Sequence, residues 1–228
     1  MMFPVPEPMP SAVTAVDRPE VRVAAFFDLD GTLIPGSANI PLATAAFRAG
    51  LVNVRELALD LTRNLAFMLK GSSDDTSAKV RDRILRGVQG HRASEVEALT
   101  DGFVDDLVAT ITPTMREVLD EHRAAGHALV LVSASPTELV SRFAAAAGMD
   151  LGVGTTAGRD ADGRYDGTLA GPFCYKEGKA EVVRALAEEH GFDLTRSYAY
   201  SDSVSDEPML AVVGNPVAVN PDHELRMM

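Results

Sequence analysis

Short apolar runs alternate with amphipathic segments along much of the chain. Uninterrupted runs at residues 21–27, 128–132 and 197–200 suit strands that are buried on both faces, and a last short run lies at residues 217–219. The segments between these runs carry apolar side chains at helical spacing, and several end at a glycine. Strands that alternate with helices indicate a mostly parallel sheet with helices on both faces. The pattern therefore predicts an α/β fold.

The region between the first two of these strands has a different pattern. Residues 41–111 contain no strand-like run, and their apolar side chains recur every three or four positions. Three such stripes are Leu57, Leu61 and Leu65; Val80, Ile84 and Val88; and Phe103, Leu107 and Ile111. Residues 94–97, Ser-Glu-Val-Glu, read as a capping box that opens a single third helix. We expect an all-helical insertion, residues 37–111, after the first strand.

A hairpin is expected in the second half of the chain. Short strands around residues 151–156 and 165–169 flank residues 160–163, where an Asp-Gly step favours a tight turn. A helix over residues 136–147 precedes them. Residues 135–138, Ser-Pro-Thr-Glu, read as a capping box at the start of that helix, with proline in its first turn.

Composition narrows the function classes. With 228 residues, 46% of them hydrophobic, the chain can bury a substantial core. A net charge of −12 argues against nonspecific binding to nucleic acids or anionic membranes, which needs clustered Lys and Arg. No apolar run reaches the ~18 residues of a membrane-spanning helix. A small-molecule substrate is the expected partner.

The tails and the single cysteine suggest a cytoplasmic protein. Residues 1–20 hold five prolines and lack the basic and apolar segments of a signal peptide, so a disordered tail is expected. Residues 223–228 form a short C-terminal tail. Cys174, alone in the chain, excludes an intramolecular disulfide and fits a reducing compartment.

The most distinctive chemistry lies where the first strand ends. Residues 28–32 read Asp-Leu-Asp-Gly-Thr, directly after an apolar run. Ligands of open α/β sheets bind outside the carboxyl ends of strands. Asp28 and Asp30 are two positions apart, so on a continuing strand both carboxylates point to one face, where their repulsion calls for a hard divalent cation. The alternative is a plain turn, in which Asp and Gly are common.

Two later residues are candidates for binding an anionic ligand. Ser133 follows the strand 128–132 and adjoins a helix N-terminus, whose free N–H groups favour phosphate. Alternatively, Ser133 only caps that helix. Lys179 lies at a helix start, an unfavourable place for a cation unless an anion is near. A solvated surface lysine is the alternative.

Two further carboxylates follow the strand at residues 197–200. Asp202 and Asp206 bracket a strand-to-helix turn, and two aspartates exceed what helix capping needs. They are therefore candidate metal ligands. A nucleophilic Cys174 is a weaker alternative, because no histidine lies near it in the sequence.

Taken together, these segments resemble a known family. Asp-x-Asp-x-Thr at residues 28–32, then Ser133, Lys179 and Asp-x-x-x-Asp at residues 202–206 are similar to the four ordered motifs of the haloacid dehalogenase (HAD) superfamily of phosphotransferases. The helical insertion directly after the first motif is similar to the small cap of its phosphoserine-phosphatase-like subgroup (subfamily IB). The resemblance covers all but the two tails.

The resemblance implies a domain arrangement. A Rossmann-like three-layer core with a mostly parallel sheet would be formed by residues 21–36 and 112–222. The all-helical cap, residues 37–111, would be inserted into that core after the first motif.

The resemblance also implies roles for the first-motif residues. Asp28 would be the nucleophile that forms an aspartyl-phosphate. Asp30 would protonate the leaving oxygen, then activate water, and hold Mg²⁺ through its backbone carbonyl. Gly31, Thr32 and Ser133 would bind the phosphoryl oxygens.

The later motifs would supply the charges that this chemistry needs. Lys179 would neutralise Asp28 and the incoming phosphate, and Lys176 is its rival. Asp202 would complete the Mg²⁺ ligands with Asp28 and Asp30. Asp206 would support those ligands or orient Lys179.

Two positions depart from phosphoserine phosphatases. Those enzymes typically carry a Glu shortly after the first motif, where it meets the amino group of the substrate, whereas Ser37 stands nearest that place here. Their fourth motif usually reads Gly-Asp-Gly-x-Asn-Asp, whereas residues 201–206 read Ser-Asp-Ser-Val-Ser-Asp. The carboxylates are kept, so phosphatase chemistry is expected, but phosphoserine is not specified.

We therefore expect a Mg²⁺-dependent phosphomonoester hydrolase that acts on a small phosphorylated metabolite. A phosphotransferase or phosphatase for a lipid or other alcohol phosphate is the alternative within enzymes. A phospho-receiver signalling module is the non-enzyme alternative, which the helical insertion disfavours. Candidate substrate contacts in the cap are Arg63, Phe67, Met68, Lys70, Lys79, Arg81, Arg83, Arg86 and Arg92.

Overall fold

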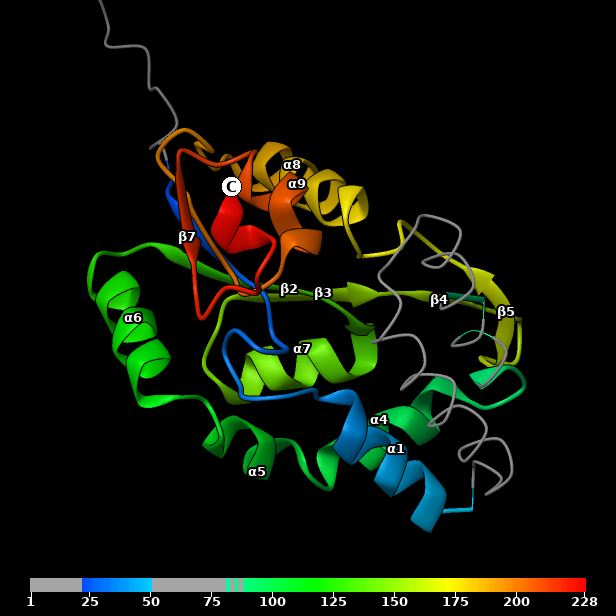
Figure 1. Cartoon of the computed structure of the whole chain (residues 1–228). Helices are drawn as coiled ribbons and strands as arrows, with labels where there is room; N and C mark the ends of the chain where they lie inside the picture. The colour runs from blue at the N-terminus through cyan, green and yellow to red at the C-terminus, as the bar shows by residue number, and fades with distance from the viewer. Residues whose placement is uncertain (1–21, 51–80, 83–84, 86–87) are drawn as a thin grey trace, which may run out of the picture.

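A five-stranded parallel sheet forms the centre of the molecule (Figure 1). The computed structural model describes residues 22–50, 81–82, 85 and 88–228. The sheet has the order β3-β2-β1-β6-β7, and every neighbouring pair is parallel. Its strands are β1 (Ala24–Phe27), β2 (Ala128–Pro136), β3 (Leu151–Thr155), β6 (Tyr198–Ser201) and β7 (Asn215–Ala218). The predicted α/β fold is confirmed.

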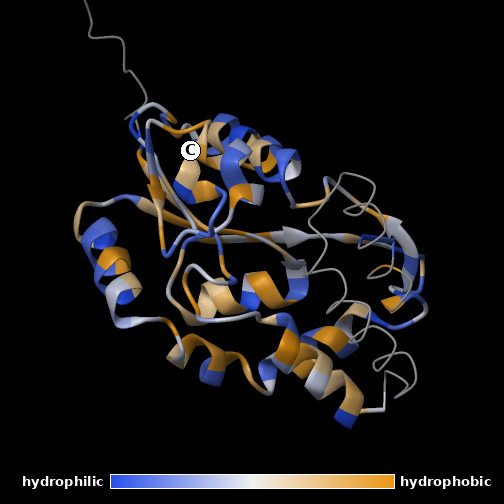
Figure 2. Cartoon of the chain, in the orientation of Figure 1, coloured by the Kyte–Doolittle hydropathy of each residue, from blue (hydrophilic) through white to orange (hydrophobic). Residues whose placement is uncertain are grey.

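Both faces of the sheet are buried, because the side chains of a strand alternate between them. Phe27 belongs to a core cluster with side chains from α5, α6 and α7, whereas Phe26 belongs to a cluster with side chains from α8 and α9. Both phenylalanines are fully buried. These helices are α5 (Val104–Ala109), α6 (Pro113–Ala124), α7 (Thr137–Ala146), α8 (Glu177–His190) and α9 (Glu207–Leu210). The molecule is therefore a three-layer sandwich, and its helices carry both hydrophobic and hydrophilic positions (Figure 2).

The described part of the segment after β1 holds turns and three complete helices. It contains α1 (Asn39–Arg48), α4 (Ala93–Asp101) and α5. The prediction of one continuous third helix was wrong, since Gly102 closes α4 and α5 begins at Val104. The capping prediction was also displaced: Glu95, not Glu97, accepts a hydrogen bond from the backbone of Arg92 at 2.8 Å.

Much of the predicted insertion lies outside the described residues. This applies to the stripe at Leu57, Leu61 and Leu65, to Val80 and Ile84, and to most of the candidate substrate contacts of the cap. The latter are Arg63, Phe67, Met68, Lys70, Lys79, Arg83 and Arg86. Arg81 and Arg92 are described.

The predicted hairpin is present with a different first strand. β3 is the edge strand of the main sheet, and a separate short strand, β4 (Ala157–Arg159), pairs antiparallel with β5 (Tyr165–Leu169). The prediction that residues 151–156 pair with residues 165–169 was therefore wrong. The Asp-Gly turn signal located the hairpin but not where the chain leaves the sheet.

The start of α7 also differs from its prediction. β2 continues through Ser135 to Pro136, and no side chain caps α7. Glu138 instead forms an ion pair with Arg159, at 2.7 Å. A tertiary partner has replaced the expected local cap.

Two short 3₁₀ helices complete the described structure, η1 (Val204–Asp206) and η2 (Leu225–Met227). Within the described ranges, no helix has the length and apolar character needed to cross a membrane.

Candidate active site

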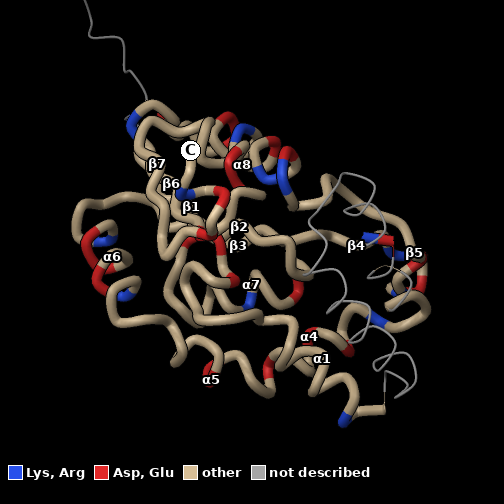
Figure 3. Tube along the Cα trace, viewed as in Figure 1, with Lys and Arg blue, Asp and Glu red and all other residues tan. Residues whose placement is uncertain are grey.

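The predicted lysine and the predicted nucleophile meet beyond the end of β1. Asp28 directly follows β1, and its backbone N–H donates to the carbonyl of Tyr200 at 3.0 Å. Lys179, in the first turn of α8, places its Nζ 2.5 Å from Asp28 Oδ1 and 2.6 Å from Asp206 Oδ2. All three side chains are buried. A single ammonium therefore joins the first and last predicted motifs. Figure 3 shows acidic positions of the trace, in red, close together at the centre of the molecule.

Burial and charge set the protonation of this group. Burial raises the pKa of Asp28 to about 7, although Lys179 opposes the shift. Burial alone would lower the pKa of Lys179, but the carboxylates of Asp28 and Asp206 raise it above its ordinary value. Lys179 therefore stays positively charged at neutral pH, which is what a partner for an anionic substrate requires.

Thr32 lies between two carboxylates from opposite ends of the motif set. Its Oγ1 is 3.3 Å from Asp28 Oδ2 and 3.2 Å from Asp202 Oδ1, and it accepts a hydrogen bond from the backbone N–H of Asp202 at 3.0 Å. A threonine hydroxyl has one hydrogen, so it can donate to only one of these carboxylates at a time. The oxygen of the other carboxylate then faces a lone pair of the Thr32 hydroxyl, which repels it. A cation bound between these oxygens would remove this repulsion.

Gly31 makes room for this arrangement. Its φ is +81°, a conformation that glycine adopts readily. A Cβ at this position would lie 2.1 Å from Asp202 Oδ2. Glycine is therefore required both by the backbone and by the closeness of Asp202.

The carboxylate of Asp30 faces the start of α1. It accepts hydrogen bonds from Ser37 Oγ and from the backbone N–H of Ala38, each at 2.8 Å. Burial raises the pKa of Asp30, and the Ala38 N–H opposes that shift. Ser37, which stands nearest the place of the substrate-binding Glu in phosphoserine phosphatases, thus contacts Asp30.

Ser133 lies inside β2, on the strand next to β1. Its side chain is buried and its Oγ accepts a hydrogen bond from the backbone N–H of Ser135 at 3.2 Å. Ser135 Oγ in turn accepts from Asn39 Nδ2 at 3.0 Å, which ties α1 to the end of β2. The alternative that Ser133 caps α7 is wrong, because no side chain caps that helix.

The structure also describes Lys176, the rival of Lys179, and Cys174, the alternative nucleophile. Lys176 immediately precedes α8, and its Nζ lies 5.9 Å from the ring centre of Tyr175. Cys174 is fully buried, and burial raises the pKa of its thiol to about 12. A thiol with such a pKa is protonated at neutral pH and is a poor nucleophile.

Sequence reasoning missed two residues that hold the last motif. Ser201 Oγ donates to Asp206 Oδ2 at 2.7 Å, so Asp206 is held by both Ser201 and Lys179. Asp222 accepts a hydrogen bond from the backbone N–H of Val204 at 2.9 Å and so fixes the loop between the two carboxylates. The position of Ser201, directly before Asp202, was the only signal for its role.

The donor set suits a hard cation. Asp28 and Asp202 flank Thr32, and burial raises the pKa of both acids. Carboxylate oxygens such as these are ligands that Mg²⁺ prefers. Within the described part of the chain, no three acidic, histidine or cysteine side chains form a ready metal cluster. The Asp30 carboxylate faces α1, so its side chain points to Ser37 and Ala38.

Comparison with known proteins places the chain in a family. Residues 25–211 match the haloacid dehalogenase-like hydrolases. The phosphoserine phosphatase SerB1 of Mycobacterium tuberculosis is 36% identical over 231 residues, which cover 99% of this chain and 74% of that protein.

Two solved structures agree with the fold. A Bordetella pertussis Tohama I protein of unknown function superposes with a TM-score of 0.77 and 29% identity, covering 91% of this chain and 94% of that one. A phosphoserine phosphatase solved as a phospho-aspartyl intermediate analogue has a TM-score of 0.61 at 21% identity, with 91% of each chain covered. The chain belongs to the haloacid dehalogenase-like hydrolase family.

Proposed function

We propose that the protein is a Mg²⁺-dependent phosphomonoesterase that works through a phosphorylated Asp28. The observation that carries the proposal is the contact of Lys179 Nζ with both Asp28 and Asp206. Membership of a hydrolase family and a relative named phosphoserine phosphatase support it. The phospho-receiver alternative has no such support.

The charge balance explains why such a site is needed. A carboxylate that approaches a phosphate dianion is repelled by it. Lys179 is buried between two carboxylates, so it offers a fixed positive charge with no need to reorganise during the reaction. Asp28, Asp202 and the Asp30 carbonyl would hold Mg²⁺, which supplies further positive charge and would favour the ionised form of Asp28.

The reaction would proceed in two steps. A carboxylate oxygen of Asp28 bonds to phosphorus while the ester P–O bond breaks, and Asp30 gives its proton to the departing alkoxide. Asp30 then takes a proton from water as that water attacks phosphorus and releases Asp28. The raised pKa of Asp30 suits an acid that starts protonated. Thr32 and Ser133, with the backbone at Gly31, would bind the phosphoryl oxygens.

The helical insertion would act as a cap over this site, formed by residues 37–111. The Asp30 carboxylate is held by Ser37 and by the Ala38 backbone, directly before α1. Movement of α1 would therefore change the position of Asp30, the proposed acid and base of the reaction. Closure of such a cap would exclude water during phosphoryl transfer.

The proposed substrate is a small phosphorylated metabolite in the cytoplasm. Phosphoserine is one candidate substrate, because a relative is named phosphoserine phosphatase. However, Ser37 stands nearest the place where an acid would meet an amino group, and its hydroxyl serves Asp30. We therefore do not single out phosphoserine.

A panel of phosphomonoesters tests the proposal. Release of inorganic phosphate is measured with Mg²⁺, with excess chelator, and in Asp28→Asn. We expect turnover only in the wild type with Mg²⁺. Metal-independent turnover, or full activity in Asp28→Asn, would overturn the mechanism.

A further inference from the structure

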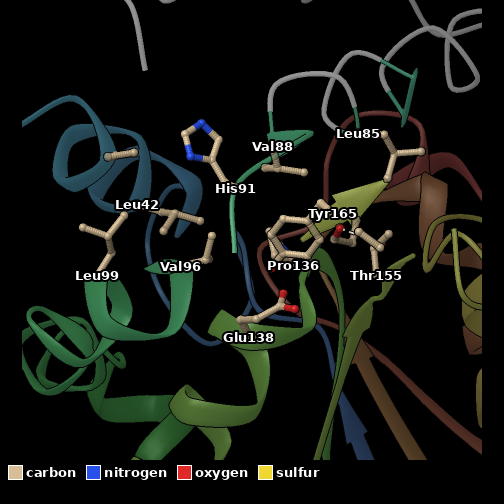
Figure 4. Close-up of a pocket in the computed structure, with 13 residues that line it drawn as sticks. Leu42, Leu85, Val88, His91, Val96, Leu99, Pro136, Glu138, Thr155 and Tyr165 are labelled. Atoms are coloured by element: carbon tan, nitrogen blue, oxygen red, sulfur yellow. Dashed lines mark hydrogen bonds between the residues drawn. The ribbon is translucent and has the colours of Figure 1, made fainter. Parts of the chain in front are cut away.

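An apolar cavity lies between the helices that follow β1 and the β2–α7 junction (Figure 4). Its volume is about 100 Å³. The walls come from the helices α1, α4 and α7, from the segment before α4, and from β2, β3, β4 and β5. The apolar side chains include Leu42, Leu85, Val88, Val96, Leu99 and Pro136. Parts of the chain far apart in sequence thus enclose one apolar space.

The polar side chains on its wall are engaged with one another or with the backbone. Glu138 is buried and pairs with Arg159 at 2.7 Å, and it also accepts a hydrogen bond from Tyr165. Thr155 Oγ1 donates to the carbonyl of Ala134 at 2.8 Å. A charged ligand would have to disrupt these pairs, so the cavity favours an apolar occupant.

The remaining polar wall residue is also paired. His91 Nδ1 lies 3.5 Å from Glu95 Oε2 on α4. Within the described lining, the polar groups therefore serve to hold the walls in place.

The cavity adjoins the proposed phosphate site. Ala134 lines it, and Ala134 directly follows Ser133 on β2. On the opposite wall, α1 carries both Leu42, which lines the cavity, and Asn39, which donates to Ser135. The alcohol portion of an ester that is bound at Ser133 and extends toward α1 would therefore enter this apolar space.

We propose that this cavity binds a compact, branched apolar portion of the alcohol that carries the phosphate. The inference rests on the proposed phosphatase function. A dry apolar cavity of ~150 Å³ in another protein binds benzene, so a space of about 100 Å³ suits a slightly smaller group such as an isobutyl or 3-methylbutyl chain. The ammonium and carboxylate of phosphoserine would gain nothing from such walls.

A series of primary alkyl phosphates measures this preference. Ethyl, isobutyl and 3-methylbutyl phosphate have leaving groups of similar basicity, so differences in kcat/KM report binding of the alkyl group. We expect kcat/KM to rise about fourfold for each buried methylene. Both 2-aminoethyl phosphate and phosphoserine should rank at or below ethyl phosphate. A flat series, or a charged ester at the top, would overturn the inference.

Filling the cavity supplies a matched pair of variants. Ala46 on α1 lines the cavity, whereas Thr44 on the same helix is exposed and does not. Ala46→Leu should reduce kcat/KM for 3-methylbutyl phosphate about tenfold and leave ethyl phosphate unchanged. Thr44→Leu should change neither ester. Equal effects of both variants on both esters would contradict the inference.

Binding without turnover separates this inference from the proposed function. Calorimetry with ethyl, isobutyl and 3-methylbutyl phosphonate, which are not hydrolysed, measures affinity alone. Graded binding in a protein that hydrolyses no ester would refute the phosphatase function and support the apolar cavity. Ester hydrolysis with equal affinity for all three phosphonates would support the phosphatase function and refute the cavity's role.

Discussion

Gly31 and Asp202 approach so closely that a methyl group on Gly31 would lie 2.1 Å from Asp202 Oδ2. The two residues are far apart in sequence and belong to the first and last predicted motifs. The contact brings the carboxylate of Asp202 against the turn that carries Asp28 and Thr32. A substitution at Gly31 should therefore disturb the proposed metal site directly.

Gly31→Ala tests this contact, and Gly36→Ala is its matched control. Both glycines have a positive φ, +81° and +84°, but nothing lies within 4 Å of a Cβ at Gly36. We expect Gly36→Ala to lose about 1–2 kcal/mol of unfolding free energy, from backbone conformation alone. Gly31→Ala should lose more and should also raise the Mg²⁺ concentration that gives half-maximal activity. Urea unfolding and Mg²⁺ titration measure the two effects, and identical behaviour of both variants would argue against the contact.

Asp206→Asn tests the support of Lys179. The substitution removes one of the two carboxylates that contact the buried ammonium, while Asp28 remains. We expect a loss of about 1–3 kcal/mol in unfolding free energy, and about a tenfold lower kcat. Ser201→Ala, which removes only the hydroxyl that donates to Asp206, should lose about 1 kcal/mol. A neutral Asp206→Asn would show that Asp28 alone holds Lys179.

Ser37→Ala tests how Asp30 is positioned. Ser37 Oγ donates to Asp30 Oδ2, so its loss should let the Asp30 carboxylate move from the position that the hydrogen bond now fixes. We expect kcat/KM for alkyl phosphates, which reports the first step and its proton-requiring leaving group, to fall about tenfold. The kcat/KM for p-nitrophenyl phosphate, whose leaving group needs no proton, should change little. Ser37→Thr keeps the hydroxyl and should restore alkyl ester hydrolysis, while equal losses for both ester types would refute the idea.

His122 predicts how stability depends on pH. It lies on α6, is buried, and contacts His127 Nδ1 and the Tyr200 hydroxyl, each at 2.8 Å. Burial, helped by His127, lowers the pKa of His122 to about 4. Above the ordinary pKa of ~6.5 the histidine is neutral in both the folded and the unfolded protein, and its contribution to stability is complete.

Below that pH, His122 is protonated in the unfolded state but stays neutral in the folded state. Unfolding free energy should therefore fall as the pH drops from about 6.5 to about 4, by up to about 3 kcal/mol. His122→Gln removes the titrating group and should flatten the profile in this window, whatever its effect at pH 7.5. Urea unfolding at several pH values measures the slope. An unchanged slope in His122→Gln would assign the acid sensitivity to other groups.

Much of the fold was accessible from the sequence because burial on two faces leaves a strong pattern. The continuous apolar run before Asp28 is one such strand, and its two phenylalanines are buried on opposite faces of the sheet. The resemblance of the ordered motifs to a known family also implied that Asp28, Lys179 and Asp206 would lie together, and Lys179 contacts both carboxylates.

What the sequence did not reveal depends on partners distant along the chain. Glu138 has the spacing of a helix cap, yet its carboxylate pairs with Arg159. Ser37 carries no signal that it would donate to Asp30. Residues 151–155 have strand character, but only the packed sheet decides that they pair with β2 and not with β5. Local sequence patterns thus predicted the helices and strands well, but they predicted poorly which distant residues these elements contact.

The most direct test of the proposed mechanism is to trap phosphorylated Asp28. The wild type, with Mg²⁺ and a hydrolysed phosphomonoester, is quenched in acid during turnover, and its peptides are analysed by mass spectrometry. Asp28→Asn and a sample with excess chelator serve as controls. We predict one added phosphoryl group on Asp28 in the wild type with Mg²⁺, and none in either control. Turnover with no phosphoryl group on Asp28, or a phosphoryl group that persists on another residue in Asp28→Asn, would contradict the mechanism.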